Sequence, residues 1–248
     1  MTIANRTIAV CDILGFTKLV QNNPLDDVVK NGFGQFRDIL YRVVHHKEPP
    51  EETLSLRELT EQSRVGLAWF SDTVLFYSLE DTEEDCRRVI ESTMWLIFFT
   101  MLNPALRVRG AVSYGEVFID QTNGLFFGVP IIEAYKLQEL QDWSGGALAP
   151  SLVSRVPPEY FRTKVYDWYF TDYPVPLKSY DPPFNDIRWA IDWTRGIHGV
   201  PDPWTFLWSP SSSEPTEEDR RDSSGKVIKW MNTRDFHAAK CEFCNTGG

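Results

Sequence analysis

Residues 6–20 of this chain read RTIAVCDILGFTKLV, and this stretch carries the first evidence about the fold. Four apolar residues, Ile-Ala-Val-Cys, lead directly into a lone carboxylate at Asp12, and a glycine follows at Gly15. The apolar run predicts a buried strand over residues 7–11 that ends where the glycine allows a turn. An aspartate at the end of such a strand lies at an edge of the predicted sheet.

A second carboxylate stands at the tip of a predicted β-hairpin. Residues 64–79, RVGLAWFSDTVLFYSL, form two apolar runs joined at Ser71-Asp72. If this hairpin neighbours the first strand, Asp12 and Asp72 emerge at one edge of the sheet. Two carboxylates there repel each other unless a cation lies between them, and Mg²⁺ and Mn²⁺ bind carboxylate, water and phosphate oxygens. The pair therefore predicts a divalent metal site.

The glycine turn adds a possible phosphate site. Gly15 and Phe16 present backbone N–H groups where the next helix is expected to begin, an arrangement that suits phosphate. Metal carboxylates beside such amides indicate chemistry on a nucleoside triphosphate. Either aspartate alone is explained as well by a turn or a helix cap. The pair, each member at the end of an apolar strand, favours the metal site.

The rest of the pattern predicts an α+β fold. Helical spacing of apolar residues is expected over residues 24–47, 80–102 and 128–143. Residues 106–120 are strand-like, with Gly110 expected as a bulge and Gly115 as a turn. This order of strands, helices and hairpins is typical of a sheet covered by helices.

The C-terminal part of the sequence has a weaker pattern. We expect a main domain over residues 1–170 and a C-terminal extension, residues 171–248, that packs on it. Residues 209–225, SPSSSEPTEEDRRDSSG, have the composition of a flexible loop. The segment KVIKWMNTRDF, residues 226–236, is a candidate for one more strand.

Composition excludes several classes of partner. The formal net charge is −10 and no basic stripe is found, which argues against binding to nucleic acid. The longest apolar run, residues 94–102, is much too short to span a bilayer, and the N-terminus lacks a signal pattern. We therefore expect a cytoplasmic protein that binds neither nucleic acid nor a membrane.

Four segments together resemble the class III nucleotide cyclases. CDILGFT is similar to their first metal-binding segment, FSDTVLF to their second, RVRGAVSYGEV to their R-x-G-x-x-x-G hairpin, and FFGVPIIEAYKL to the helix with their transition-state residues. The segments occur in the family's order over residues 6–143. The resemblance implies a ferredoxin-like α+β catalytic domain with a mixed, largely antiparallel sheet. It also implies a homodimer whose active sites are built across the interface.

The departures from the family pattern concern the base and the transition state. The position of the lysine that helps purine cyclases to read the base is Ala68, and the partner acidic position is Leu125. The positions of the transition-state Asn and Arg hold Ile132 and Lys136. This combination resembles the pyrimidine nucleotide cyclases of the Pycsar anti-phage system. That resemblance implies conversion of UTP, less readily CTP, to a 3′,5′-cyclic monophosphate that activates a separate effector protein.

The same resemblance implies roles for individual residues. Asp12 and Asp72, with the carbonyl group of Ile13, would hold two Mn²⁺ or Mg²⁺ ions. Gly15, Phe16 and Thr17 would bind the phosphates of the substrate.

The roles of three basic residues stay open. Arg109 is either a solvated arginine at a sheet edge or a residue that contacts phosphate or the dimer partner. Lys136 is either a helix-surface lysine or a replacement for the missing transition-state arginine, with Glu133 as a residue that orients it. Arg64 is either a surface arginine or a donor to O4 of uracil.

Three alternative functions are weighed. A non-catalytic cyclase-homology module that serves as a dimerisation or regulatory partner is supported by the loss of the Asn and Arg positions. The retention of both metal aspartates argues against it. A purine cyclase is disfavoured by Ala68 and Leu125, and a metal-dependent nuclease by the acidic charge.

Overall fold

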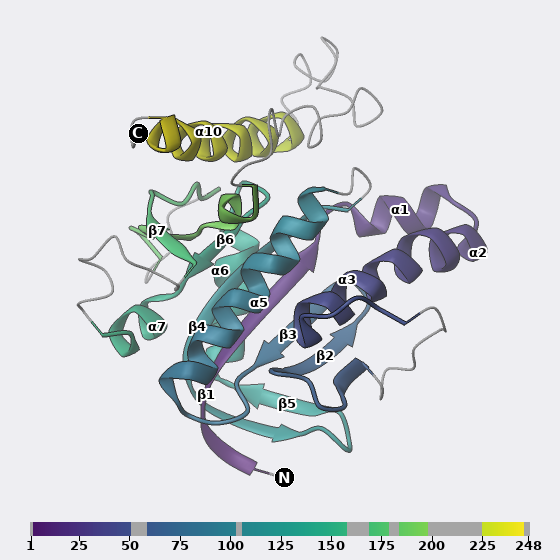
Figure 1. Ribbon diagram of the computed structural model, residues 1–248, viewed down its shortest axis with the longest axis vertical. Helices are drawn as coiled ribbons and strands as arrows, with labels where there is room; N and C mark the ends of the chain where they lie inside the picture. Colours follow the sequence, from purple (N-terminus) through teal and green to yellow (C-terminus); the bar gives the residue numbers. More distant parts are fainter. Residues whose placement is uncertain are drawn as a thin grey trace.

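The structure is a computed structural model that describes residues 2–50, 59–102, 106–157, 169–178, 184–197 and 225–245. Its centre is an eight-stranded sheet in the order β2-β3-β1-β4-β6-β8-β7, with β5 paired to β4 (Figure 1). The strands are β1 (Thr2–Ile13), β2 (Gly66–Phe70), β3 (Thr73–Tyr77), β4 (Val108–Asp120), β5 (Leu125–Gly128), β6 (Gly146–Leu148), β7 (Phe170–Asp172) and β8 (Trp189–Ile191). Neighbouring strands are antiparallel except for β4 and β6, which are parallel. The expected α+β fold with a mixed, largely antiparallel sheet is confirmed.

Helices cover both faces of this sheet. They are α1 (Phe16–Asn22), α2 (Leu25–Asp27), a π-helix (Val28–Phe33), α3 (Gly34–His45), α5 (Glu83–Met101), α6 (Val129–Leu140), α7 (Pro150–Arg155), a 3₁₀-helix (Trp193–Ile197) and α10 (Gly225–Asn245). The helices expected over residues 80–102 and 128–143 are confirmed. The helix expected over residues 24–47 is divided, and the π-helix lies where Gly32 and Gly34 lower the helix propensity.

Alternation along β4 defines which helix covers which face. Arg109 and Ser113 point towards α6, because Arg109 bonds to Gln138 and the Ser113 hydroxyl donates to the carbonyl oxygen of Pro130. Gly110 points the other way, against α5, where an added Cβ would lie 3.2 Å from Thr93. Side chains directly opposite each other in neighbouring strands share a face. Asp12, which pairs with Arg109, therefore belongs to the face that α6 covers.

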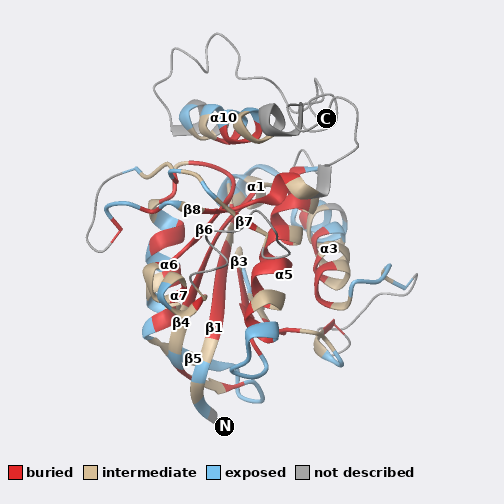
Figure 2. Ribbon diagram, turned by 60° about the vertical axis from the view of Figure 1, so that its left-hand side comes forward, coloured by how far each residue is buried: buried red, intermediate tan, exposed pale blue. Residues whose placement is uncertain are grey.

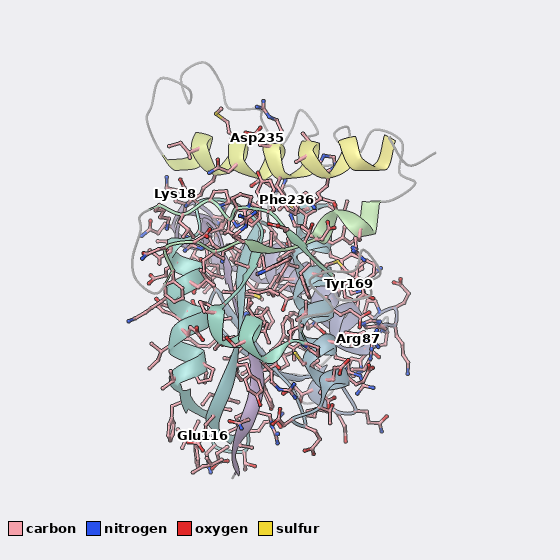
Figure 3. The ribbon with its side chains drawn as sticks, turned by 90° about the vertical axis from the view of Figure 1, so that its left-hand side faces the viewer. Lys18, Arg87, Glu116, Tyr169, Asp235 and Phe236 are labelled. Carbon is pink, nitrogen blue, oxygen red and sulfur yellow. The ribbon has the colours of Figure 1, made fainter. Side chains whose placement is uncertain are left out.

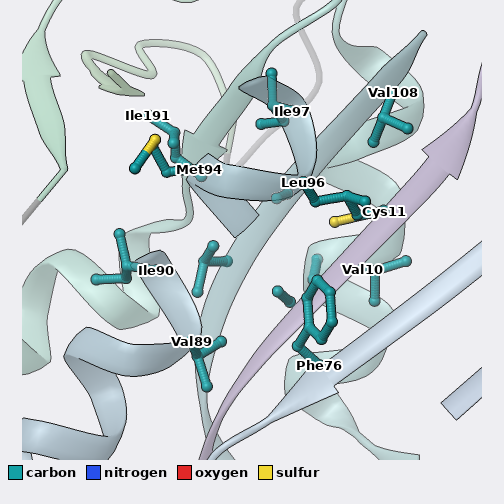
Figure 4. Packing of buried hydrophobic residues seen from close by; sticks show 14 of the residues in the cluster. Val10, Cys11, Phe76, Val89, Ile90, Met94, Leu96, Ile97, Val108 and Ile191 are labelled. Atoms are coloured by element: carbon teal, nitrogen blue, oxygen red, sulfur yellow. The ribbon is translucent and has the colours of Figure 1, made fainter. Parts of the chain in front are cut away.

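The main core lies between the sheet and α5. Figure 4 shows Cys11 and Phe76 from the central strands packed against a row of apolar residues of α5. The members of α5 in this row are Val89, Ile90, Met94, Leu96 and Ile97, all fully buried. Thr82 caps the helix by accepting a hydrogen bond from the Asp85 amide. This rigid layer fixes β1, and hence the position of the aspartate at its end.

Strand β4 differs from the expectation at both glycines. It runs without interruption and stays in register with β1 from Val108 to Ile119, so Gly110 is not a bulge and Gly115 is not a turn. The reason for glycine at both positions is that neighbouring side chains leave no space for a Cβ atom. A Cβ at Gly110 would lie 2.9 Å from Cys11 Sγ, and one at Gly115 would lie 2.9 Å from Pro130 Cγ.

The C-terminal part contributes to the same sheet. The expected boundary after residue 170 falls inside β7, and β8 joins β7 to β6. The strand expected over residues 226–236 is wrong, because this segment lies within helix α10. Its buried residues, Thr233, Phe236 and His237, recur at helical spacing. Figure 2 shows the buried part of α10 on the side that faces the sheet. Of the expected flexible loop, residues 209–224 lie outside the described part of the chain.

A search of the described helices for a membrane span found none with sufficient length and apolar character.

Candidate active site

The two aspartates expected to bind metal lie side by side at one end of the sheet, where β1 terminates and β3 begins. Strand β1 pairs with β3, with Asp12 opposite Thr73. The amide of Ile13 donates a hydrogen bond of 2.9 Å to the carbonyl oxygen of Asp72, which ties the hairpin tip to the end of β1. Ser71 adopts φ 55°, the left-handed conformation that a two-residue hairpin turn requires. The strands are thus neighbours, as the metal-site prediction requires.

A pocket of about 560 Å³ opens at this end of the sheet. Its lining includes Asp12, Ile13 and Asp72. Residues 14–18, where the chain leaves β1 and enters α1, form a second wall. Gly15 makes this change of direction possible with φ 79°, and α1 begins directly afterwards at Phe16. Gly15, Phe16 and Thr17 therefore lie beside the two aspartates.

Arg109 is buried in this pocket rather than solvated. Its Nη2 donates a hydrogen bond of 3.1 Å to Oδ2 of Asp12, and its Nε donates one of 2.9 Å to Oε1 of Gln138. Its Nη1 contacts the carbonyl oxygens of Glu139 and Gln141. The interpretation of Arg109 as a solvated arginine at a sheet edge is wrong, because β4 is a central strand. The side chain instead fixes the Asp12 carboxylate.

Opposing effects act on the Asp12 carboxyl. Burial raises its pKa above the ordinary value, and the nearby Asp72 raises it further, while Arg109 lowers it. Arg107, which lines the same pocket, is desolvated enough that its pKa falls to about 10. Two carboxylates in a half-buried site carry a repulsion that a bound cation would remove.

The donor set fits a hard divalent cation that also binds substrate. Within the described ranges, no group of three or more His, Cys, Asp or Glu side chains gathers in one place. Asp12 and Asp72 offer carboxylate oxygens, and the carbonyl of Ile13 lies in the same pocket. Mg²⁺ and Mn²⁺ commonly bind to one or two carboxylates and take their other ligands from water and phosphate. These residues would hold such an ion.

A second hollow, of about 990 Å³, lies on the β2–β3 part of the sheet. Ala68 lines it and faces the same side as Asp12, because Ala68 pairs with Leu75 and Leu75 with Val10. Among the described residues that line this hollow, none is charged, and the aromatic ring of Phe126 forms part of its wall. Leu125 lies next to it at the start of β5, with half of its surface exposed.

The expected transition-state residues on α6 do not line the pocket that contains the two aspartates. Ile132 and Lys136 are exposed, one turn apart, and neither lines the pocket with Asp12. Glu133, expected to orient Lys136, accepts hydrogen bonds from the amide and the hydroxyl of Ser151 instead. The part that Lys136 takes in catalysis therefore stays a prediction.

Arg64 is engaged elsewhere. Its Nη2 forms an ion pair of 3.2 Å with Glu91, and its Nη1 contacts the ring of His46. Burial and the adjacent guanidinium lower the pKa of His46. Arg64 lines neither the pocket at Asp12 nor the hollow at Ala68, so the structure does not support it as the residue that reads uracil.

One wall of the pocket was not predicted from the sequence. Lys229 and Thr233 of helix α10 line it together with Ser144. Their spacing of four residues is a helical signal that the strand interpretation of residues 226–236 concealed.

Comparison with solved structures identifies the fold. The catalytic core of a rhodopsin-guanylyl cyclase with converted specificity, in complex with ATPalphaS, matches with a TM-score of 0.52 at 12% identity, over 77% of this chain and 98% of that chain. The fold is that of class III nucleotide cyclase catalytic domains. At 12% sequence identity, this structural match shows the fold and does not show the substrate.

Two further structures match less closely. The guanylyl cyclase Cya2 has a TM-score of 0.47 at 14% identity, over 83% of this chain and 97% of that chain. A bacterial light-regulated adenylyl cyclase has a TM-score of 0.45 at 15% identity over 76% of this chain. This chain spans about half of the latter structure, 51% of its length. No protein-family model and no curated protein sequence matches the chain.

Proposed function

We propose that this chain is a pyrimidine nucleotide cyclase that converts UTP, less readily CTP, to the 3′,5′-cyclic monophosphate and pyrophosphate. The observation that carries the proposal is the joint placement of Asp12 and Asp72 in one pocket with the Gly15 turn. Metal-binding carboxylates beside backbone amides at a helix start suit the triphosphate of a nucleotide. The cyclase fold adds support.

Each residue of this site has a part in the proposed reaction. Asp12 and Asp72 would hold two Mn²⁺ or Mg²⁺ ions with the Ile13 carbonyl. Such ions, when bound, lower the pKa of a ribose hydroxyl and neutralise charge on the phosphates. The backbone at Gly15, Phe16 and Thr17 would orient the phosphates. The bond that forms joins the ribose 3′ oxygen to the α-phosphorus, and the bond that breaks releases pyrophosphate.

In the proposed reaction Arg109 orients the Asp12 carboxylate. Because it donates to Oδ2 of Asp12 and is itself held by Gln138, it keeps the carboxylate in one orientation. We therefore assign Arg109 as a positioning residue. A direct contact with phosphate is less favoured, since its Nε, Nη1 and Nη2 atoms all donate to protein groups.

The preference for a pyrimidine rests on the hollow at Ala68. Its lining is apolar and aromatic apart from threonine and glutamine side chains, among them Gln121. The lysine and the acidic residue of the purine cyclases that the sequence resembles are replaced by Ala68 and Leu125. Without these two groups a purine base loses its polar partners, and unpaired polar groups disfavour binding.

A homodimer is part of the proposal. Several large apolar side chains on β5 and α6 are exposed: Phe127 (59%), Val129 (77%), Ile132 (56%) and Tyr135 (46%). Such a patch is typical of a protein interface. Pairing two copies through this patch would bring the partner subunit's Lys136 towards the substrate at Asp12, where its ammonium group would stabilise charge in the transition state.

The Pycsar resemblance extends the proposal to the role in the cell. In that role the cyclic nucleotide is a second messenger in the cytoplasm that activates a separate effector protein during phage infection. A non-catalytic module of the same fold is the alternative, and the presence of both aspartates in one pocket favours the enzyme.

The test is incubation of the purified protein with each of the four NTPs and Mn²⁺. Products are identified by mass spectrometry, and the Asp72→Ala variant is the control. We expect cyclic UMP, with less cyclic CMP, from the wild type alone. Cyclic AMP or GMP would refute the pyrimidine assignment, whereas a stable dimer without product from any NTP would identify the non-catalytic module.

A further inference from the structure

Helix α10 forms one wall of the pocket that contains the two aspartates. It lies across the end of the sheet at which β1 terminates (Figures 1 and 2). Lys229 and Thr233 line the pocket of about 560 Å³ together with Asp12 and Asp72. Both belong to the same chain as the aspartates, so no second protomer is needed to bring them there. The segments that resemble the cyclases end at residue 143 and assign nothing to this helix.

Specific contacts fix the rotation of α10 about its axis. The Thr233 hydroxyl accepts a hydrogen bond of 2.9 Å from the amide of Ser144, and Asn232 donates one of 2.8 Å to the carbonyl oxygen of Asp142. Phe236 is fully buried, with its ring 5.0 Å from that of Trp143. Figure 3 shows Phe236 on the underside of the helix, towards the sheet, and Asp235 on the opposite side.

The rotation of α10 about its axis determines where Lys229 lies. It precedes Thr233 by four residues, and residues four apart lie on the same face of a helix. The face that packs on the sheet therefore carries Lys229 over the aspartate pocket. The side chain is half-buried, and burial together with the charge of Arg109 lowers its pKa.

Among the described basic residues that line this pocket, Lys229 is the half-buried one whose ammonium group is open to a ligand. Arg109 donates a hydrogen bond to Asp12, and Arg107 donates to the carbonyl oxygens of Thr100 and Leu106. Lys18 lies at the exposed rim. For Lys229 Nζ, no hydrogen bond or ion pair is found with any described residue. A half-buried cation without a partner is costly unless an anion reaches it.

We propose that Lys229 is a phosphate-binding residue that contacts the polyphosphate chain of the substrate from helix α10 of the same protomer. The proposed function supplies the identity of this ligand, a nucleoside triphosphate. Its phosphates would lie between the Gly15 turn on one side and Lys229 on the other, with the metal-binding aspartates at the base. Helix α10 is then part of the active site and not only an extension that covers the sheet.

The test measures binding of inorganic tripolyphosphate in the presence of Mn²⁺ by isothermal titration calorimetry. We expect Lys229→Met, which keeps the length of the side chain, to bind roughly tenfold more weakly than the wild type. Lys229→Arg should restore most of the affinity because it restores the charge. Arg234→Ala, which removes an exposed cation from the same helix, is the matched control and should bind like the wild type. Thermal unfolding of each variant establishes that it is folded.

Kinetics with the nucleotide separate this proposal from the proposed function. If the wild type forms cyclic product and Lys229→Met binds tripolyphosphate as tightly as the wild type, the role of Lys229 is overturned and the cyclase assignment is left intact. A Lys229-dependent affinity without product from any NTP would support Lys229 and overturn the cyclase. A wild type that does not bind tripolyphosphate would overturn the role of Lys229.

Discussion

Arg109 and Asp12 are directly opposite each other on β4 and β1, and Nη2 of Arg109 lies 3.1 Å from Oδ2 of Asp12. The ion pair is mostly shielded from water, since the two side chains are 10% and 19% exposed. It joins the third cyclase-like segment, RVRGAVSYGEV, to the first, CDILGFT, across a central pair of strands. The carboxylate that would hold metal is thereby oriented before any ligand binds.

Removal of Arg109 should destabilise the protein. Arg109→Ala leaves the Asp12 carboxylate and the acceptors on Gln138 and Gln141 without their donor. Loss of one member of a buried pair costs about 3 kcal/mol of unfolding free energy. Urea denaturation monitored by circular dichroism measures the change.

The matched control is Arg188→Ala, which breaks an ion pair with Asp172 whose side chains are 54% and 55% exposed. Exposed pairs contribute less than about 1 kcal/mol. Equal losses for the two variants would contradict the structural role of the Arg109 pair.

Replacement of Asp72 should remove metal binding without loss of stability. Asp72→Asn eliminates one carboxylate and also a repulsion that raises the pKa of Asp12. We expect Mn²⁺ affinity to fall by about tenfold or more, while the unfolding free energy without metal is unchanged or higher. Electron paramagnetic resonance of free Mn²⁺ gives the affinity. The exposed Asp186→Asn serves as control, and an unaltered Mn²⁺ affinity in Asp72→Asn would place the metal elsewhere.

The docking of α10 should depend on Phe236. This ring is fully buried against Trp143, Tyr173 and Trp193. Phe236→Ala leaves a cavity and should cost about 3 kcal/mol. The loss should appear as faster amide hydrogen exchange over residues 231–240, while β1 and β4 stay protected. Met231→Ala, at a side chain that is 43% exposed, should change little. Uniform exchange across both regions would show instead that α10 and the sheet unfold together.

Acid should weaken the same contact through His237. Its ring is buried, stacked 5.9 Å from that of Trp193, and burial lowers its pKa below the ordinary 6.5. Well above pH 6.5 the ring is neutral in both the folded and the unfolded state and contributes no pH dependence. Below it the unfolded chain binds a proton that the folded chain binds poorly, so stability falls until the lower folded pKa is reached.

Between pH 7.5 and 5.5 this loss should be at most about 1.4 kcal/mol, measured by urea denaturation at each pH. His237→Asn, which cannot titrate, should lose less over the same interval. An identical pH dependence in the two proteins would assign the effect to other groups.

Mixed dimers provide a test of the shared active site. Asp72→Ala and Lys136→Ala should each be inactive alone. If each site takes Asp72 from one protomer and Lys136 from the other, a heterodimer has one intact site and one doubly altered site. Equal mixing and random exchange of protomers should restore about a quarter of the wild-type activity. Absence of any recovery, with exchange shown by native mass spectrometry, would mean that each site takes Asp72 and Lys136 from the same protomer.

The sequence alone determined the elements whose signals are local. The apolar run before Asp12, the two runs on either side of Ser71-Asp72, and the helical spacing over α5 and α6 predicted where these elements lie. Each is encoded by a run or a periodic spacing of apolar residues within a short window. The order of these elements was enough to predict the α+β sheet. The pairing of β1 with β3, which brings the two aspartates together, was a condition of that prediction and is seen only in the tertiary structure.

Only the tertiary structure decided the features that depend on distant neighbours. The burial of Arg109 comes from α6 and from β1, which lies 97 residues away in sequence. Helix α10 resembled a strand in isolation, because its buried face consists of a threonine, a phenylalanine and a histidine. That face is stabilised by hydrogen bonds to a segment 89 and 90 residues earlier. Lys229 thus reaches the aspartate pocket through contacts that no local pattern encodes, since long-range packing sets the rotation of the helix that carries it.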